Sequence, residues 1–200
     1  ADLWEIDPSL VANQIGYLPQ SVDLFKGTLH SNLVLSGAAS DSQLLQICND
    51  LGIDQIINNS PKGLDHDIFE GGAGLSGGQR QLVGLARVFL AQPKIWLLDE
   101  PTASLDNLSE AKVLDAIQRY VKADDILVIS THRPMLASKL ANRILLIEAG
   151  KIADQGSPDQ VLPRLMANAG SKSVKQSGKT KTAAPQDSIA PVNRGGFDVI

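Results

Sequence analysis

Two adjacent carboxylates, Asp99 and Glu100, directly follow the continuously apolar run Ile95–Leu98. Such short runs, partly β-branched, are typical of strands buried on both faces of a parallel sheet. Ligands of open α/β sheets bind at the carboxyl ends of these strands. One carboxylate there can hold Mg²⁺ through water, and its neighbour can take a proton from an attacking water. A pair of ordinary loop-capping acids is the alternative interpretation.

A glycine-rich stretch precedes a helix-like pattern of apolar residues over Gln79–Ala91. Ser76 and Gln79 form an S-x-x-Q capping box, which by itself explains both residues as helix-start chemistry. Gly77 and Gly78 add bare backbone N–H groups, and a helix start with exposed amides and a hydroxyl is an anion site. Phosphate binding and plain capping both remain open on these residues alone.

Two further polar residues follow apolar runs. His132 comes after Ile126–Ile129, and Gln20 comes after the expected strand Ile15–Pro19. A lone histidine is more often structural, but one at the carboxyl edge of a sheet beside two acids has a better claim to a function. Gln20 is a neutral amide without catalytic meaning of its own.

Strand-like and helix-like periods alternate in the second half of the chain, which predicts an α/β fold with an open sheet and right-handed crossovers. The expected elements are strands over Ile95–Leu98, Ile126–Ile129 and Ile144–Ile147 and helices over Gln79–Ala91 and Asn107–Lys122.

A separate short helix is expected over residues 41–51, with Asp41 as its N-cap and Gly52 as its stop. It belongs to a stretch, residues 25–92, that is mostly helical in pattern and poor in strands. This stretch is predicted to form a helical lobe inserted into the α/β lobe.

Composition excludes several classes of protein. The chain of 200 residues has a net charge of −4, a pI of about 5.3 and a single cysteine. These values argue against a nucleic-acid footprint over the whole surface and against a disulfide scaffold. The longest apolar runs are far shorter than the ~20 residues that cross a bilayer.

Charge changes sign near the end of the chain, from net −7 over residues 1–167 to net +3 over residues 168–200. The last stretch is rich in Ser, Lys, Ala, Gln and Pro, which predicts a disordered tail. A basic arm attracted to a membrane or to nucleic acid is the alternative.

Together, these segments resemble the ATP-binding subunit of an ABC transporter over residues 1 to about 165. The matching segments are Gly16–Gln20 with the Q-loop, Leu75–Gln79 with the signature motif, Ile95–Glu100 with the Walker B strand and its glutamate, Ala103–Asp106 with the D-loop, and His132 with the switch histidine. Five motifs in the family's order are highly specific.

The resemblance implies a P-loop NTPase-like ABC ATPase domain that lacks its N-terminal part and carries an inserted helical subdomain. It divides the chain into part of the ATPase lobe (1–24), the helical signature subdomain (25–92), the rest of the ATPase lobe (93–167) and the tail (168–200). In this family, two domains in a head-to-tail homodimer hold ATP between them and drive a transmembrane permease.

The resemblance also implies a role for each matching residue. Asp99 would bind Mg²⁺ through water, Glu100 would polarise the attacking water, and Gln20 would contact Mg²⁺ or that water. His132 would hold the γ-phosphate. The residues of the signature motif would bind the partner's ATP, and Asp106 would line the dimer seam. These signature residues are Ser76, Gly77, Gly78 and Gln79.

Two segments resemble exporters rather than importers: Leu24–Leu29 with Asn32, and Gly63–Gly72, which is similar to the exporter segment that touches the permease. The run Gln81–Arg87 is most similar to the ATPase/permeases of type I protein secretion. The chain is therefore expected at the cytoplasmic face of the inner membrane, through a permease fused upstream, with ATP and Mg²⁺ as ligands and no nucleic acid.

One departure from the family concerns the P-loop, G-x-x-x-x-G-K-[ST]. Gly178–Thr180 mimics its end, but Ser173 stands where the first glycine is needed and the surroundings are the predicted tail. In the family the P-loop lies upstream of the Q-loop, so the resemblance implies a P-loop before Ala1. The start at Ala1 rather than Met leads us to expect a chain cut from a longer one or processed. Two rival interpretations stay open: a regulatory or interaction module without its own nucleotide, and an ABC ATPase of chromosome maintenance.

Overall fold

The computed structural model describes residues 7–8, 11, 14–35, 39–176 and 198–199. The chain divides into two compact units, Ala1–Ser130 and Thr131–Ile200. Gly178–Thr180, the segment that mimics a P-loop end, lies outside the described residues.

A parallel three-stranded sheet organises the first unit, with strand order β1–β4–β5. Its strands are β1 (Ile15–Leu18), β4 (Ile95–Asp99) and β5 (Ile126–Ser130). In register, Ile95 lies beside Ile15 on one side and Ile126 on the other. The α/β class and the parallel pairing predicted for these strands are therefore confirmed.

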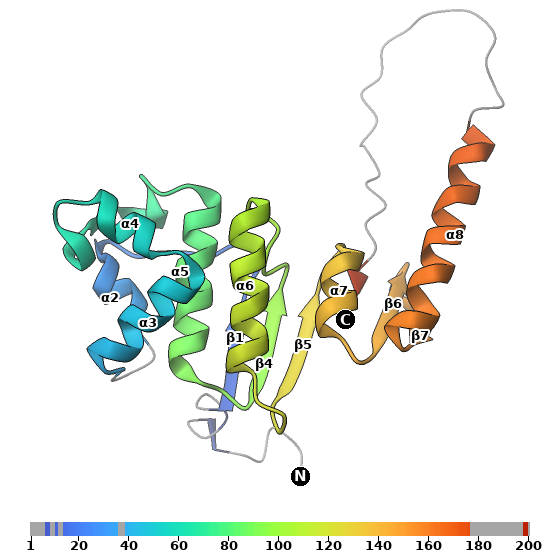
Figure 1. Ribbon diagram of the computed structural model, residues 1–200, viewed down its shortest axis with the longest axis horizontal. Helices are drawn as coiled ribbons and strands as arrows, with labels where there is room; N and C mark the ends of the chain where they lie inside the picture. Colours follow the sequence, from blue (N-terminus) through green and yellow to red (C-terminus); the bar gives the residue numbers. More distant parts are fainter. Residues whose placement is uncertain (1–6, 9–10, 12–13, 36–38, 177–197, 200) are drawn as a thin grey trace, which may run out of the picture. The chain divides into compact units, whose positions relative to one another are not determined.

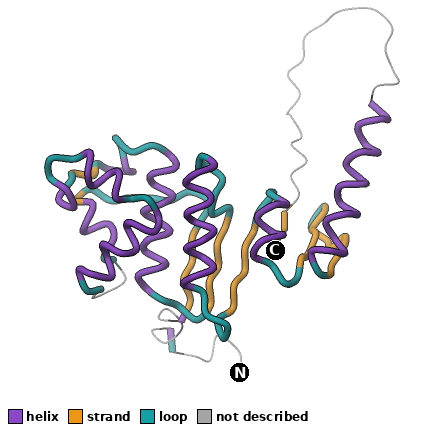
Figure 2. Tube along the Cα trace, in the orientation of Figure 1, coloured by secondary structure: helices purple, strands orange, loops and turns teal. Residues whose placement is uncertain are grey.

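Helices fill the chain between β1 and β4, as the purple segments of Figure 2 show. The elements of this stretch are β2 (Gly27–Thr28), α2 (Leu29–Leu33), α3 (Asp41–Leu51), α4 (Asp54–Asn59), the 3₁₀ turns η2 (Gly63–Asp65) and η3 (Glu70–Gly72), β3 (Asp67–Ile68) and α5 (Gly77–Ala91). The antiparallel β2–β3 pair is its only sheet among the described residues. A strand-poor helical insertion is what the sequence predicts here.

The α3 helix begins one residue earlier than expected. Ser40, not Asp41, is its N-cap: the Ser40 hydroxyl accepts a hydrogen bond from the Gln43 N–H, and the Gln43 side chain returns the bond to Ser40. Asp41 instead stands in the first turn, where its charge favours the helix dipole. The predicted stop at Gly52 is confirmed, because Gly52 adopts a left-handed conformation with φ of 81°.

One face of the sheet is covered by α5 and α6 (Asn107–Tyr120), which lie on the same side of the three strands in Figure 1. Phe89 of α5 makes edge-on ring contacts with Trp96 of β4 and Tyr120 of α6, each with centroids 5.3 Å apart. The side chains of Leu18 and Leu98 point to this covered face and are almost fully buried. On the other face, Tyr17 keeps 60% of its surface exposed.

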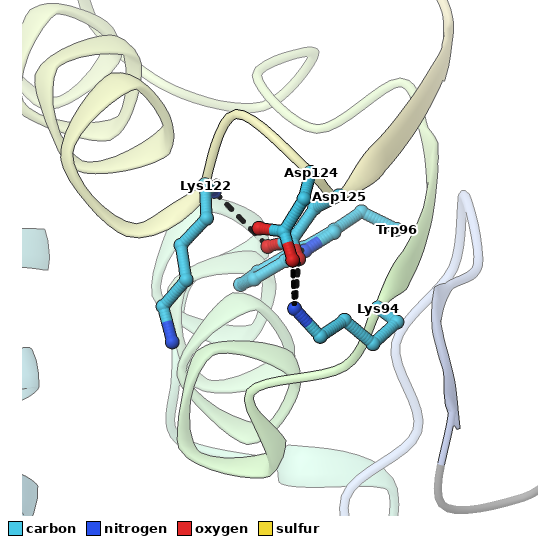
Figure 3. A network of polar contacts seen from close by, with 5 residues as sticks. All are labelled: Lys94, Trp96, Lys122, Asp124 and Asp125. Atoms are coloured by element: carbon cyan, nitrogen blue, oxygen red, sulfur yellow. Dashed lines mark hydrogen bonds and ion pairs between the residues drawn. The ribbon is translucent and has the colours of Figure 1, made fainter.

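The amino ends of β4 and β5 are joined by a polar network, shown in Figure 3. Lys94 pairs with Asp124 at 2.9 Å and with Asp125 at 3.0 Å, and Asp125 also accepts bonds from the Trp96 indole and the Lys122 backbone N–H. This network fixes the register of the two strands at the edge opposite the acids Asp99 and Glu100.

The second unit corrects the expectation for Ile144–Ile147. This strand, β6 (Ile144–Glu148), pairs antiparallel with β7 (Lys151–Gly156) and β8 (Asp198–Val199), and not within the parallel sheet. Ala149 and Gly150, with φ of 49° and 73°, form a two-residue hairpin turn whose twist favours antiparallel pairing. The unit also contains α7 (Pro134–Leu140) and α8 (Pro158–Gln176).

The predicted disordered tail, residues 168–200, differs from the structure at both of its ends. Helix α8 continues to Gln176, although Gly170, Ser171 and Ser173 in this stretch are weak helix formers. Asp198–Val199 pairs with β6, where a β-branched residue suits a strand. Residues 177–197 lie outside the described residues, so disorder there stays a prediction, as do the four domain boundaries.

Candidate functional site

The start of α5 has the capping box that the sequence predicts. The Gln79 N–H donates to the Ser76 hydroxyl at 3.1 Å, and the Ser76 N–H donates to the Gln79 side-chain oxygen at 2.9 Å. The Arg80 guanidinium donates to the Leu75 carbonyl at 2.7 Å and braces the approach to the helix. Capping therefore accounts for Ser76 and Gln79, and it leaves the role of the two glycines between them to be explained.

Gly78 lies against the loop that follows β4. A Cβ atom on Gly78 would come within 2.7 Å of the Ser104 carbonyl oxygen, a distance that real Cβ atoms essentially never show. On Gly77 the nearest atoms, those of the Ser104 side chain, would be 3.8 Å away, which is ordinary contact. Gly78 thus permits a close approach of two backbones, whereas packing does not require a glycine at position 77.

Glu100 turns the chain away from the sheet at the end of β4. Its φ of 48° lies in the left-handed region, which is uncommon outside glycine. Its backbone N–H donates to the Ser130 carbonyl at 2.9 Å, and its carbonyl accepts from the Ala103 N–H at 3.2 Å. The residue is buried, with 6% of its surface exposed.

Gln81 joins α5 to this turn. Its amide donates to the Glu100 carbonyl at 3.3 Å, and only 4% of its surface is exposed. No role was assigned to Gln81 from the sequence. A signal did exist, because Gln81 stands four residues before Leu85 and so falls on the apolar face of an amphipathic helix.

Gln20 and the two acids leave the sheet at the same edge. The parallel pairing of β1 with β4 sets Leu18 beside Leu98, so both strands end at the same edge of the sheet. Gln20 is exposed, and Asp99 is half-buried in register with Ser130 of β5. The edge thus presents a neutral amide and a carboxylate where open α/β sheets bind their ligands.

Asp106 is the N-cap of α6. Its carboxylate accepts from the Ser109 N–H at 2.8 Å and from the Ser109 hydroxyl at 3.2 Å. The bond from the Ser109 N–H is the main cause that holds the pKa of Asp106 below its ordinary value. A charged capping carboxylate fixes the end of the 103–106 loop, and therefore the position of Ser104 against Gly78.

His132 belongs to the second unit. It lies in a bend just before α7 and is exposed. Its role with the phosphate stays a prediction.

The sequence is similar to a large group of transport proteins. The profile of the family described as ABC transporter matches residues 2–103. The chain belongs to the ABC transporter family.

Relatives of this ABC protein include a putative export ATP-binding/permease protein of Rickettsia typhi, 38% identical over 78% of the chain and 27% of the relative. The ABC transporter ATP-binding protein YwjA of Bacillus subtilis is 38% identical over 74% of the chain and 26% of the relative. The chain thus spans about a quarter of the length of these relatives.

A solved structure extends the likeness to three dimensions. A bacterial Atm1-family ABC exporter with ATP bound is 28% identical, with a TM-score of 0.78 over 86% of this chain and 31% of that one. The P-loop NTPase-like fold of an ABC ATPase domain predicted from the sequence is therefore confirmed. Within the described part of the chain, no helix has both the length and the apolar character needed to cross a membrane.

The protein side chains at this edge of the sheet could hold Mg²⁺ only if phosphate and water completed its coordination. Among the described residues, no group of three or more His, Cys, Asp or Glu side chains is arranged to hold a metal ion. Mg²⁺ is commonly held by one or two carboxylates plus substrate phosphates rather than by an all-protein cage. The carboxylate of Asp99 and the amide of Gln20 at one sheet edge match that donor set.

Proposed function

We propose that this chain is the ATP-hydrolysing region of an ABC exporter that works as a head-to-tail homodimer. Asp99 holds Mg²⁺ through water, Glu100 polarises the attacking water, and Gln20 contacts the metal or that water. His132 holds the γ-phosphate, and Asp106 lines the dimer seam. The partner's ATP is gripped by the start of α5, through Ser76, Gly77, Gly78 and Gln79.

The observation that carries this proposal is the attachment of α5 to the Walker B turn. Gln81 bonds to the Glu100 carbonyl, and Gly78 packs on Ser104. In the proposed dimer, this attachment would tie the signature motif that serves one ATP site to the catalytic loop of the other. A helix start that served only as a cap would not need this connection, because the Ser76–Gln79 box is complete without it.

In this proposal the P-loop is supplied by sequence outside these 200 residues. The 200 residues contain no G-x-x-x-x-G-K-[ST] segment. A triphosphate needs a ring of backbone N–H groups and a lysine to balance its charge. A permease preceding that P-loop would hold the chain at the cytoplasmic face of the membrane.

Support for the exporter branch comes from the β2–β3 pair. Gly27 and Ile68 are partners in this pair, so the two exporter-like segments form one surface. Phe25 and Phe69 beside it keep 38% and 59% of their surfaces exposed. Exposed aromatics of this kind suit an apolar contact with a permease. Protein or peptide export of the type I secretion class is the narrower proposal, and it rests on the similarity of Gln81–Arg87.

The test of the proposed function is Glu100→Gln in the complete transporter. The amide keeps the shape of the side chain but cannot accept the proton, so steady-state ATP hydrolysis should fall by about 10²-fold or more. ATP binding and ATP-driven dimerisation should persist. Asp115→Asn, which also replaces a carboxylate by an amide but at an exposed position of α6, is the matched control and should hydrolyse ATP at the parental rate. Hydrolysis by Glu100→Gln within a few-fold of the parent would contradict the assignment.

A further inference from the structure

Arg87 lies on α5, about two turns after the signature motif ends at Gln79. Its guanidinium donates three hydrogen bonds to residues that are far away in sequence. Nε donates to the Asn32 carbonyl at 2.6 Å, Nη2 to the Asn32 side-chain oxygen at 2.8 Å, and Nη1 to the Asp23 carbonyl at 3.0 Å. The guanidinium also lies 5.9 Å from the ring centre of Phe25. All of these partners follow Gln20 within the next dozen residues.

Asn32 connects Arg87 to the backbone of residues 25–28, just before α2. It is fully buried, and its amide donates to the carbonyls of Phe25 and Thr28 at 3.0 Å each. Its side-chain oxygen accepts from the Phe25 N–H at 3.1 Å as well as from Arg87. The Arg87–Asn32 pair, which we call the latch, therefore fixes the backbone from residue 23 to residue 28.

Packing one turn earlier on the same face of α5 also brings this segment against the helix. A Cβ on Gly84 would be 2.6 Å from a Val22 methyl, so the helix and the segment after Gln20 are in close contact. Next to them, Tyr17, Pro19, Val22 and Arg87 help to line a groove of about 240 Å³. The segment thus has room beside it, and the directed bonds of the latch determine where it lies.

We propose that Arg87 is a positioning residue that fastens the Gln20-bearing segment to the signature helix. This inference rests on the proposed function: a displacement of Gln20 at one ATP site moves α5, and with it the Ser76–Gly78 start that serves the other site. The three bonds use three different nitrogens of the planar guanidinium, and a lysine, with all its donors on one nitrogen, does not reproduce that spread.

The latch itself is tested by hydrogen exchange on the full chain. Arg87→Lys keeps the charge and most of the stem, and should speed exchange of the Phe25 N–H by about tenfold or more. Asn32→Ala removes the acceptor of the Phe25 N–H together with both amide donations, and should have the same effect. Arg119→Lys is the control: this arginine also bonds across helices, to Asp50 at 2.8 Å, but far from the Gln20 segment along the chain. Unchanged exchange at Phe25 in both latch variants would overturn the proposal.

The coupling is tested by ATP hydrolysis in the complete transporter. Arg87→Lys should lower kcat by about tenfold while KM for ATP stays within twofold, and Arg119→Lys should change neither. Gln20→Ala combined with Arg87→Lys should be no slower than the slower single variant, because both act through one segment. Multiplicative effects would overturn the coupling. If the parent hydrolyses no ATP, the proposed function fails, and the exchange experiment still decides whether the latch exists.

Discussion

The backbone of Glu100 is strained, while that of its neighbour Asp99 continues the strand. A left-handed conformation costs a non-glycine residue roughly 1 kcal/mol. The bonds from its N–H to Ser130 and from Ala103 and Gln81 to its carbonyl hold it there. In the proposed function the metal ligand Asp99 ends the strand, and the base Glu100 stands in the turn that leaves it.

The two signature glycines should respond differently to alanine. Gly77→Ala should cost less than about 1 kcal/mol of stability, since its Cβ would meet nothing closer than 3.8 Å. If the segment grips phosphate in trans, the same change should abolish ATP-driven dimerisation in a Glu100→Gln background. Gly78→Ala should instead destabilise the fold by about 1–3 kcal/mol, because its Cβ would clash with the Ser104 carbonyl.

Thermal unfolding and sedimentation with ATP separate these effects of the glycine variants. Normal ATP-driven dimerisation of Gly77→Ala would indicate that this segment serves only as a helix cap. Gly78→Ala with parental stability would show that Ser104 moves away freely.

Local sequence patterns predicted the side chains whose hydrogen-bond partners are close in sequence. Ser76 and Gln79 are three residues apart, so their reciprocal bonds could be predicted from spacing alone. Arg87 and Asn32 are 55 residues apart, and nothing in the run Gln81–Arg87 indicates which backbone the arginine reaches. Long polar side chains acquire their partners from the tertiary fold, which a single sequence does not show.

At the scale of elements, periodicity identified most helices and strands but not the sheet to which each strand belongs. Ile144–Ile147 has the same apolar character as Ile126–Ile129, and the two lie in different sheets. The deciding signal was the two-residue Ala149–Gly150 connection, too short for a parallel crossover. Loop length is thus as informative as the strand itself.

The junction between α3 and α6 predicts a pH dependence of stability. Partial burial acts to raise the pKa of Asp50, but bonds from Tyr120, Gln46 and Arg119 outweigh it and hold this pKa below its ordinary value. A carboxylate with a lowered pKa stabilises the fold above its unfolded pKa, and that stability is lost as pH falls through the folded pKa.

Asp50→Asn should therefore be less stable than the parent near neutral pH, by about 1–3 kcal/mol for lost bonds to a charged group. The difference should begin to shrink below about pH 4, where the carboxylate of the unfolded chain becomes protonated while the folded one, with its lowered pKa, stays charged. Urea unfolding from pH 3 to pH 7 measures it, with the exposed Asp115→Asn as control. A gap that does not depend on pH would contradict the assignment.

At the scale of the whole molecule, association is expected to depend on the apolar side chains that the described part of the first unit leaves exposed on the sheet face opposite α5 and α6. Tyr17 is 60% exposed, and its in-register neighbour Leu97 is only partly buried. An apolar sheet face of this kind favours association. We expect the chain to self-associate at micromolar concentration. Tyr17→Lys should weaken that association about tenfold in sedimentation velocity, and Phe69→Ser, which removes an exposed aromatic elsewhere, should not. Equal effects of both changes would indicate unspecific aggregation.

The 200-residue chain alone should bind MgATP very weakly and hydrolyse none measurably. A triphosphate carries several negative charges, and without a P-loop no described segment surrounds it with both N–H groups and a lysine. Asp99 and Glu100 would then face the phosphates as like charges unless Mg²⁺ intervenes. The start of α5 offers amides, but in this proposal they grip a nucleotide already held by the partner. Calorimetry of the chain with MgATP measures the affinity, with the Gly77→Ala variant showing how much α5 contributes. Joining the chain to a P-loop-bearing upstream segment should restore binding. A micromolar dissociation constant for the chain alone would mean that a complete phosphate site exists within these residues, and the proposed division of the ATP site between segments would be wrong.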